Sequence, residues 1–192
     1  MGTGILCQTL SENGLDGLAY TLLLQTDCPS WLYSVRQGAT TIWERWNSYT
    51  LETGFGDVSM NSFNHYAYGA VAEWMYRFMV GIEADEHAPG FTHFYLQPRP
   101  DVRTDAELPK GQERITYAKG TFESPKGEIY AAWENKDGFR YEVHIPEGTR
   151  ATLFLPLFGK DSYKQNGVCQ QTECGVDKAR ISLPAGSYIF EV

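Results

Sequence analysis

The sequence predicts an α+β protein in which a few helices are followed by antiparallel β-strands. Two observations lead to this prediction. Apolar residues recur at helical spacing in the first 90 residues, whereas residues 139–145 alternate strictly between apolar and polar side chains. The length of 192 residues suffices for one large domain, or for one small domain plus part of another. We therefore predict a helical part in residues 1–90 and a β-rich part in residues 91–192.

The composition changes near residue 90, and this change sets the predicted boundary. Residues 1–90 carry ten acidic and three basic residues, whereas residues 91–192 carry fourteen acidic and thirteen basic ones. A hydrophobic content of 42% and a charged content of 21% are typical of a folded globular protein. The net charge of −8 argues against a nucleic-acid partner, because phosphates would not be neutralised.

The first 30 residues predict two short helices. Residues 4–10 have the pattern of the end of a helix, which residues 12–14 stop with Glu-Asn-Gly. A second apolar helical face follows at i, i+3, i+4, i+7 and i+8, formed by Leu15, Leu18, Ala19, Leu22 and Leu23. Two such helices have no partner for their apolar sides, so we expect them to belong to a larger helical assembly.

Residues 30–61 are rich in aromatic residues and glycine, which predicts a functional surface rather than a connector. The strongest helical pattern follows, from Phe63 to Ile82, with Asn61 or Ser62 as its N-cap. His65 would then lie in the first turn of this helix.

The chain changes to a period of two after residue 91. Phe139, Tyr141, Val143 and Ile145 share one face of a predicted strand, and residues 151–155 and 188–192 repeat the pattern. Turns are predicted at four places, residues 125–127, 135–138, 146–148 and 184–186. Short strands at this spacing predict an antiparallel β-sandwich.

The candidate site is the segment GATTIWERW at residues 38–46, where Glu44 lies between Trp43 and Trp46 with Arg45 beside it. Indole faces hold the apolar side of a sugar ring. Two indoles would also weaken the hydration of the carboxylate, which makes it a better proton acceptor. The alternative is a half-buried strand in which Glu44 and Arg45 form an ordinary ion pair.

GATTIWERW, followed by MNSFNHYAYGAVAEWMYR at residues 60–77, resembles the C-terminal part of the catalytic domain of bacterial α-L-rhamnosidases, glycoside hydrolase family 78. The segments PSWLYSVRQ and PGFTHFYLQPRP resemble the same family, and the likeness extends from about residue 4 to about residue 155. The resemblance implies an inverting glycosidase that acts on a rhamnose-containing oligosaccharide or glycoside. It implies Glu44 as the general base and His65 as a sugar-binding residue. From the chemistry of their indoles we expect Trp43 and Trp46 to bind substrate as well.

The resemblance also implies part of an (α/α)6 barrel, followed by the β-sandwich. A barrel of that kind needs about twelve helices, and residues 1–90 supply about three. The family's general acid lies in an acidic motif far upstream, and no such motif occurs here. We therefore expect the base without the acid, and no useful hydrolysis by this chain alone. Asp57 could orient the water or a hydroxyl, although a solvated loop aspartate is the commoner case.

A different class of function remains open, in which the chain is a stand-alone carbohydrate-binding or structural β-sandwich module without catalysis. In either case we expect a homo-oligomer, because four residues of the helical faces, Leu18, Leu22, Trp74 and Phe78, would otherwise be uncovered. No apolar run has the roughly 20 residues needed to span a bilayer, so no membrane partner is expected.

The four cysteines predict neither a metal site nor a cofactor. The spacing of Cys169 and Cys174 fits no usual zinc pattern, although the two could close a small loop in an oxidising compartment. Cys7 and Cys28 lie within or beside apolar helical segments, which predicts buried thiols.

Overall fold

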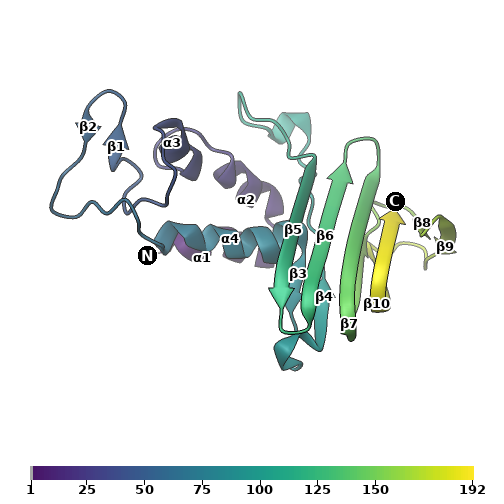
Figure 1. Ribbon diagram of the computed structural model, residues 1–192. Coiled ribbons are helices and arrows are strands. Elements are labelled where there is room, and N and C mark those ends of the chain that lie inside the picture. The colour runs from purple at the N-terminus through teal and green to yellow at the C-terminus, as the bar shows by residue number, and fades with distance from the viewer. Residues whose placement is uncertain (1) are drawn as a thin grey trace. The chain divides into compact units, whose positions relative to one another are not determined.

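The computed structural model describes residues 2–192, which form two compact units (Figure 1). Unit 1 is Met1–Trp74 together with Asp101–Arg114, and unit 2 is Met75–Pro100 together with Ile115–Val192. Helices and loops make up most of unit 1, whereas unit 2 is built mainly of strands. The change of composition near residue 90 therefore falls inside unit 2.

Both helices predicted at the start of the chain are present, as α1 (Thr3–Glu12) and α2 (Asp16–Leu23). α1 packs on α2 and on α4 (Val71–Trp74). The Trp74 indole meets the Tyr20 ring edge-on at 5.2 Å, and its Nε1 donates to Ser11 Oγ at 2.9 Å. Trp74 is only 2% exposed and Phe78 only 5%, so the prediction that their surfaces are uncovered is wrong, whereas Leu18 is 47% exposed.

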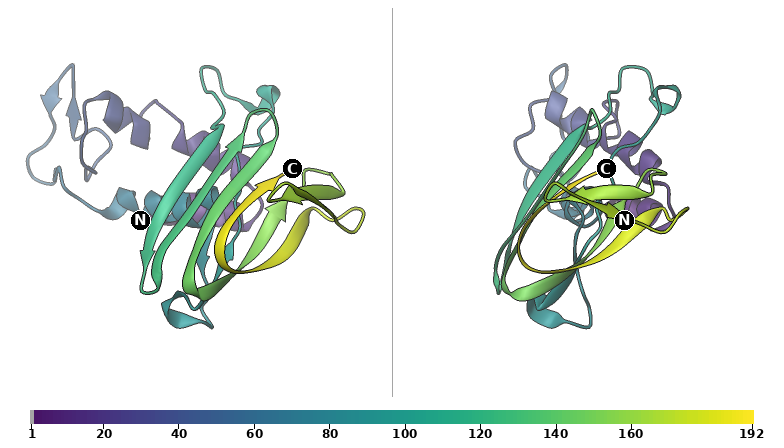
Figure 2. Two further views of the ribbon diagram at one scale, coloured as in Figure 1. Left: turned by 45° about the vertical axis from the view of Figure 1, so that its right-hand side comes forward. Right: turned by 90° about the vertical axis from the view of Figure 1, so that its right-hand side faces the viewer.

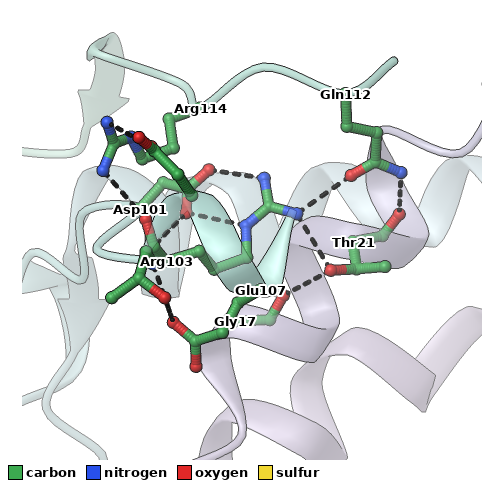
Figure 3. A network of polar contacts seen from close by, with 9 residues as sticks. Gly17, Thr21, Asp101, Arg103, Glu107, Gln112 and Arg114 are labelled. Carbon is green, nitrogen blue, oxygen red and sulfur yellow. Dashed lines mark hydrogen bonds and ion pairs between the residues drawn. The ribbon is translucent and has the colours of Figure 1, made fainter. Parts of the chain in front are cut away.

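A buried ion pair anchors the segment Asp101–Arg114 to α2 within unit 1 (Figure 3). The Arg103 guanidinium donates to both carboxylate oxygens of Asp101, at 2.9 and 2.7 Å. Its Nη1 also donates to Thr21 Oγ1 and to Gln112 Oε1, each at 2.9 Å. The short 3-10 helix η4 (Asp105–Glu107) lies in the same segment and begins with a capping box at Thr104.

The long helix predicted from residue 63 to residue 82 is wrong in form. The structure has three short helical pieces instead: the 3-10 helix η1 (Ala67–Ala70), then α4, then the π-helix η2 (Met75–Val80). His65 therefore precedes the first helical residue instead of lying in a first turn, and neither Asn61 nor Ser62 is its N-cap. The sequence did not predict the helix α3 (Trp31–Arg36). Its N-cap is Ser30, whose Oγ accepts from Tyr33 N.

Gly81 terminates η2 in a conformation that only glycine accommodates. Its φ is +92°, and a Cβ at this position would lie 2.3 Å from Pro98 N. The Gly81 N–H donates to Tyr76 O and its carbonyl accepts from Gln97 N. The chain can thus leave the helix and enter the sheet of unit 2 within two residues.

Unit 2 contains one sheet of eight strands. They are β3 (Ile82–Ala84), β4 (His93–Leu96), β5 (Tyr117–Ser124), β6 (Gly127–Asn135), β7 (Phe139–Pro156), β8 (Ser162–Gln165), β9 (Val168–Gln171) and β10 (Lys178–Glu191). The order is β3-β4-β7-β10-β8-β9, and β6 joins β5 to β7. A short 3-10 helix, η3 (Pro89–Phe91), connects β3 to β4. The predicted turns at residues 125–127 and 135–138 are confirmed, because β5 and β6 end at these points.

The sheet is mixed, so the prediction of purely antiparallel pairing is wrong at one place. β4 runs parallel to the second half of β7, with His93 opposite Arg150 and Leu96 opposite Leu153. The other strand pairs of the sheet are antiparallel.

Two predicted turns are bends within continuous strands. β7 continues through residues 146–148, and β10 continues through residues 184–186. Their register shifts between Pro184, which pairs with Arg150, and Gly186, which pairs with Ile145. A bulge of this kind lets both strands curve while they remain paired, as Figure 2 shows.

The inner face of this sheet packs on η2 within unit 2. Trp133 Nε1 donates to Met79 O at 2.7 Å, and the Tyr141 hydroxyl donates to Val80 O at 3.1 Å. Met79 and Val80 are the last two residues of η2, so their carbonyls have no partner within the helix, and the two sheet side chains satisfy them.

Candidate active site around Glu44

Two segments that are far apart in the sequence pair at the candidate site. His65 N donates to Ile42 O, and Glu44 N donates to Ser62 O, both at 2.9 Å. The Thr41 hydroxyl also donates to Phe63 O. The backbone of residues 41–44 is therefore fixed against that of residues 62–65, and this pairing brings the WERW and NHYAYG motifs together.

The Glu44 carboxylate is held by the main chain. Its Oε2 accepts from Ser62 N at 2.8 Å, and the side chain is half-buried. No other hydrogen bond or ion pair involves this carboxylate within residues 2–192, and the ion pair with Arg45 considered above is not formed there. One oxygen is thus fixed while the other has its acceptor capacity unused.

Trp46 forms an aromatic platform with two residues that the sequence reasoning did not select. Its ring stacks on Tyr68 at 3.8 Å with an interplanar angle of 5°, and Trp31 meets it edge-on at 5.4 Å. Trp31 Nε1 donates to Tyr68 O at 2.8 Å, which fixes the backbone of η1 at Tyr68. Ser34 Oγ donates to Trp46 O at 2.9 Å.

Trp43 lies in a separate aromatic cluster and is only 6% exposed. Its ring meets Phe63 edge-on at 5.3 Å and Tyr49 at 6.5 Å, and Phe55 contacts both of those rings. Tyr49 and Phe55 belong to a short hairpin formed by β1 (Tyr49–Thr50) and β2 (Gly54–Phe55). The two tryptophans therefore have different surroundings, one inside a packed cluster and one on a half-exposed platform.

The His65 imidazole is half-buried and parallel to the Tyr66 ring, with centroids 5.7 Å apart. Its Nδ1 accepts from Ala67 N at 3.4 Å. The tautomer that fits this bond carries its proton on Nε2, which is then able to donate to a hydroxyl.

Asp57 is an exposed loop residue. Its Oδ1 accepts from Ser59 N at 2.9 Å, and this backbone bond lowers the pKa of the carboxyl below its ordinary value. The carboxylate thus stabilises its own turn, which is the commoner role foreseen for it.

The described residues contain no group of three or more His, Cys, Asp or Glu side chains placed to hold a metal ion. Cys7 is buried, and burial raises the pKa of its thiol to about 11. Cys28 is exposed, so the prediction of a buried thiol is wrong there. Cys169 and Cys174 are exposed free thiols. No helix within residues 2–192 is both long enough and apolar enough to cross a membrane.

The sequence reasoning missed Ser62, Tyr68 and Trp31 as parts of this site. The only sequence feature that could have indicated a role for Tyr68 in the site was its position off the apolar stripe of the predicted helix. Ser62 was predicted to cap that helix instead. The ladder between residues 41–44 and 62–65 could not be foreseen, because neither segment has a clear period of two.

Two family descriptions match the chain in the order of the two predicted parts. Residues 1–79 match the bacterial α-L-rhamnosidase six-hairpin glycosidase domain, and residues 81–170 match the bacterial α-L-rhamnosidase C-terminal domain. The fold and the sequence therefore define a glycosidase-domain segment followed by an accessory β-rich domain. The chain belongs to the bacterial α-L-rhamnosidase family.

Curated relatives and solved structures agree with this assignment. An α-L-rhamnosidase of Formosa agariphila is 42% identical over 165 residues, which are 85% of this chain and 16% of the relative. One from Streptomyces avermitilis is 36% identical over 194 residues, which are 100% of this chain and 17% of the relative. The chain thus spans about one sixth of the length of these relatives.

Among solved structures, the Streptomyces avermitilis α-L-rhamnosidase complexed with L-rhamnose has a TM-score of 0.82 and 34% identity, covering 100% of this chain and 17% of that one. The native Aspergillus terreus enzyme has a TM-score of 0.75 and 30% identity, covering 100% of this chain and 19% of that one.

Proposed function

We propose that Glu44 is the general base of an inverting α-L-rhamnosidase of which this chain forms a part. The observation that carries the proposal is the geometry of its carboxylate, with Oε2 held by Ser62 N at 2.8 Å and the other oxygen unengaged. A base must be fixed in place and must keep a free lone pair for the proton of water. Glu44 meets both requirements and is fixed against the second motif, whereas Asp57 is exposed and is bonded only to Ser59 of its own turn.

Inversion requires a second carboxyl group that protonates the leaving oxygen, about 6.5–9.5 Å from the base. No acidic motif of the kind that the family uses occurs in the 192 residues. We therefore assign the acid to segments that the longer relatives contain and that this chain does not span. In the same proposal, unit 1 is part of an (α/α)6 barrel and unit 2 is the β-sandwich domain that follows it.

His65 and Trp46 are assigned to the sugar. His65 is fixed beside Glu44 by the ladder to Ile42, and its Nε2 is available to donate to a rhamnose hydroxyl. Trp46 lies half-exposed on Tyr68 and suits an apolar sugar face. A substrate contact by Trp43 stays a prediction, and its 6% exposure limits that contact to one edge of the ring. The substrate class is a rhamnose-containing oligosaccharide or glycoside, as in the relatives.

The test is Glu44→Gln in a complete rhamnosidase that carries this segment, with the exposed Glu52→Gln as the matched control. Glutamine keeps an oxygen for Ser62 N but cannot accept the proton, so kcat should fall about 10²–10⁴-fold while rhamnose binding persists. The control should retain its kcat. A Glu44→Gln enzyme that keeps more than about a tenth of the original kcat would show that Glu44 only supports the fold.

The isolated chain should not hydrolyse rhamnosides and should self-associate. The apolar side chains at the start of unit 1 are exposed, with Ile5 at 61%, Leu15 at 50% and Leu18 at 47%. Apolar surface of this kind favours association. Light scattering should therefore report an oligomer that Leu15→Glu and Leu18→Glu dissociate, and a monomeric parent chain would refute the assignment of these faces.

A further inference from the structure

A cavity in unit 2, remote in sequence from Glu44, is not used by the proposed mechanism. It has a volume of about 540 Å³, within the range of small-molecule sites. Its lining comes from the end of β6, the start of β7 and the turn between them, from β8 and Lys160 before it, and from β9 and the end of β10. Figure 1 shows β8 and β9 beside the C-terminal end of β10.

One row of side chains across five strands contributes to the lining of this cavity. The cross-strand partners in the row are Glu134, Arg140, Glu191, Lys164 and Cys169, on β6, β7, β10, β8 and β9. Directly paired residues in an antiparallel register share one face of the sheet. The first four members of the row alternate in charge. Arg140 is paired with Glu142 at 2.9 Å and Lys164 with Glu191 at 3.9 Å.

Three further charged residues line the cavity. Lys136 and Asp137 come from the β6–β7 turn, and Lys160 comes from the chain before β8. In the part of the chain that the structure describes, neither these three side chains nor that of Glu134 forms an ion pair or a hydrogen bond. The lining side chains therefore offer unused donors and unused acceptors together.

Ser162 and Tyr163 add hydroxyl groups to the lining. Burial raises the pKa of Tyr163, so its phenol keeps its proton at neutral pH and remains a donor. Tyr163 also supplies the half-buried aromatic ring of the site, 6.2 Å from Phe190.

We propose that this cavity binds a neutral oligosaccharide through its hydroxyl groups. Each sugar hydroxyl donates one hydrogen bond and accepts others, so it suits a surface where carboxylates and cations alternate. A sulfate or a phosphate suits the cavity less well, because Arg140 and Lys164 are already paired with Glu142 and Glu191, and the carboxylates of Glu134 and Asp137 line the cavity together with the two remaining lysines. The choice of a rhamnoside as the first probe rests on the proposed function, whereas the site itself does not.

Cys169 makes a local test possible, because its exposed thiol belongs to the row and lines the cavity. Cys28 and Cys174 are exposed as well but do not line it, so they serve as internal references. The full chain is alkylated with iodoacetamide in the presence of methyl α-L-rhamnoside, cellobiose, glucuronate or sodium sulfate. Peptide mass spectrometry then gives the rate at each cysteine.

Alkylation of Cys169 alone should slow about tenfold when a neutral sugar is present at ten times its Kd. Glu134→Gln should weaken this protection about tenfold in Kd, because a charged acceptor is lost. Glu128→Gln, which is exposed on the same strand outside the cavity, should leave the protection unchanged. Circular dichroism of both variants establishes that they fold alike.

Unchanged alkylation of Cys169 with every probe would overturn the proposal, and so would protection by glucuronate or sulfate alone. Equal slowing at all three thiols would overturn it too, because that pattern is a bulk effect of the additive. Protection by cellobiose but not by the rhamnoside would support the site while weakening its link to rhamnosides. A failed Glu44→Gln test with protected Cys169 would remove the proposed function and leave this site standing.

Discussion

Replacing Arg103 by alanine should destabilise unit 1 by about 3–5 kcal/mol, which is the usual cost of breaking a buried ion pair from one side. Arg103 and Asp101 have side chains that are only 3% and 0% exposed. Removing the guanidinium deletes two bonds to the Asp101 carboxylate and one each to Thr21 and Gln112. The carboxylate then stays in a site that water scarcely reaches, without its arginine.

The double variant Arg103→Met with Asp101→Leu separates the two contributions. Removing both charges avoids a buried carboxylate that has lost its guanidinium, so this variant should lose less stability than Arg103→Ala. Urea unfolding monitored by tryptophan fluorescence measures the difference, since four of the five tryptophans, Trp31, Trp43, Trp46 and Trp74, belong to unit 1. A loss below about 1 kcal/mol in Arg103→Ala, or a double variant that is less stable than the single one, would refute this reasoning.

Three further outcomes are expected. Gly81→Ala should cost about 2–5 kcal/mol by urea unfolding, since its Cβ would meet Pro98 N at 2.3 Å, whereas Gly148→Ala, which has a positive φ but open space, should cost clearly less. The backbone bond from His87 and the contact with His93 lower the pKa of Asp85. The stability that the Asp85 carboxylate contributes to the fold is therefore present above about pH 4 and is lost as the pH falls through the lowered pKa. Asp85→Asn should flatten the acid limb of a stability–pH curve, and an unchanged limb would contradict this. His65→Ala in a complete enzyme should raise KM and lower kcat/KM more than it shifts the pH optimum, and the loss of a whole pH limb would instead indicate acid–base work.

The local sequence pattern was sufficient to predict a helix or strand where one hydrophobic period dominates the segment. The alternation from Phe139 to Ile145 predicted the first half of β7, and the spacing of apolar residues from Leu15 to Leu23 predicted α2. The two Pro-Gly segments within β7 and β10 misled the prediction, because proline and glycine also occur at bulges where paired strands curve. Whether a Pro-Gly segment turns or bends depends on the pairing partner, which the sequence does not contain.

The helix after His65 shows a similar limit. Its apolar side is buried from Val71 to Phe78, but the backbone changes from a 3-10 helix before Val71 to an α-helix and then to a π-helix. The π-turn is stabilised by Trp133 and Tyr141, which lie more than 50 residues away in the sequence. The motif order predicted that Glu44 and His65 belong to one site. Only the backbone hydrogen bonds between residues 41–44 and 62–65 specify how the two residues are placed in it.

The role of Glu44 is tested most directly by rescue with azide. In a complete rhamnosidase that carries this segment, Glu44→Ala should be nearly inactive on an aryl α-L-rhamnoside, because no group removes the proton from water. Azide needs no such base, so it should restore turnover and form the β-L-rhamnosyl azide, identified by nuclear magnetic resonance. Failure of azide to restore turnover in a variant that still binds rhamnose, or formation of the α-azide, would contradict the assignment of Glu44 as the general base.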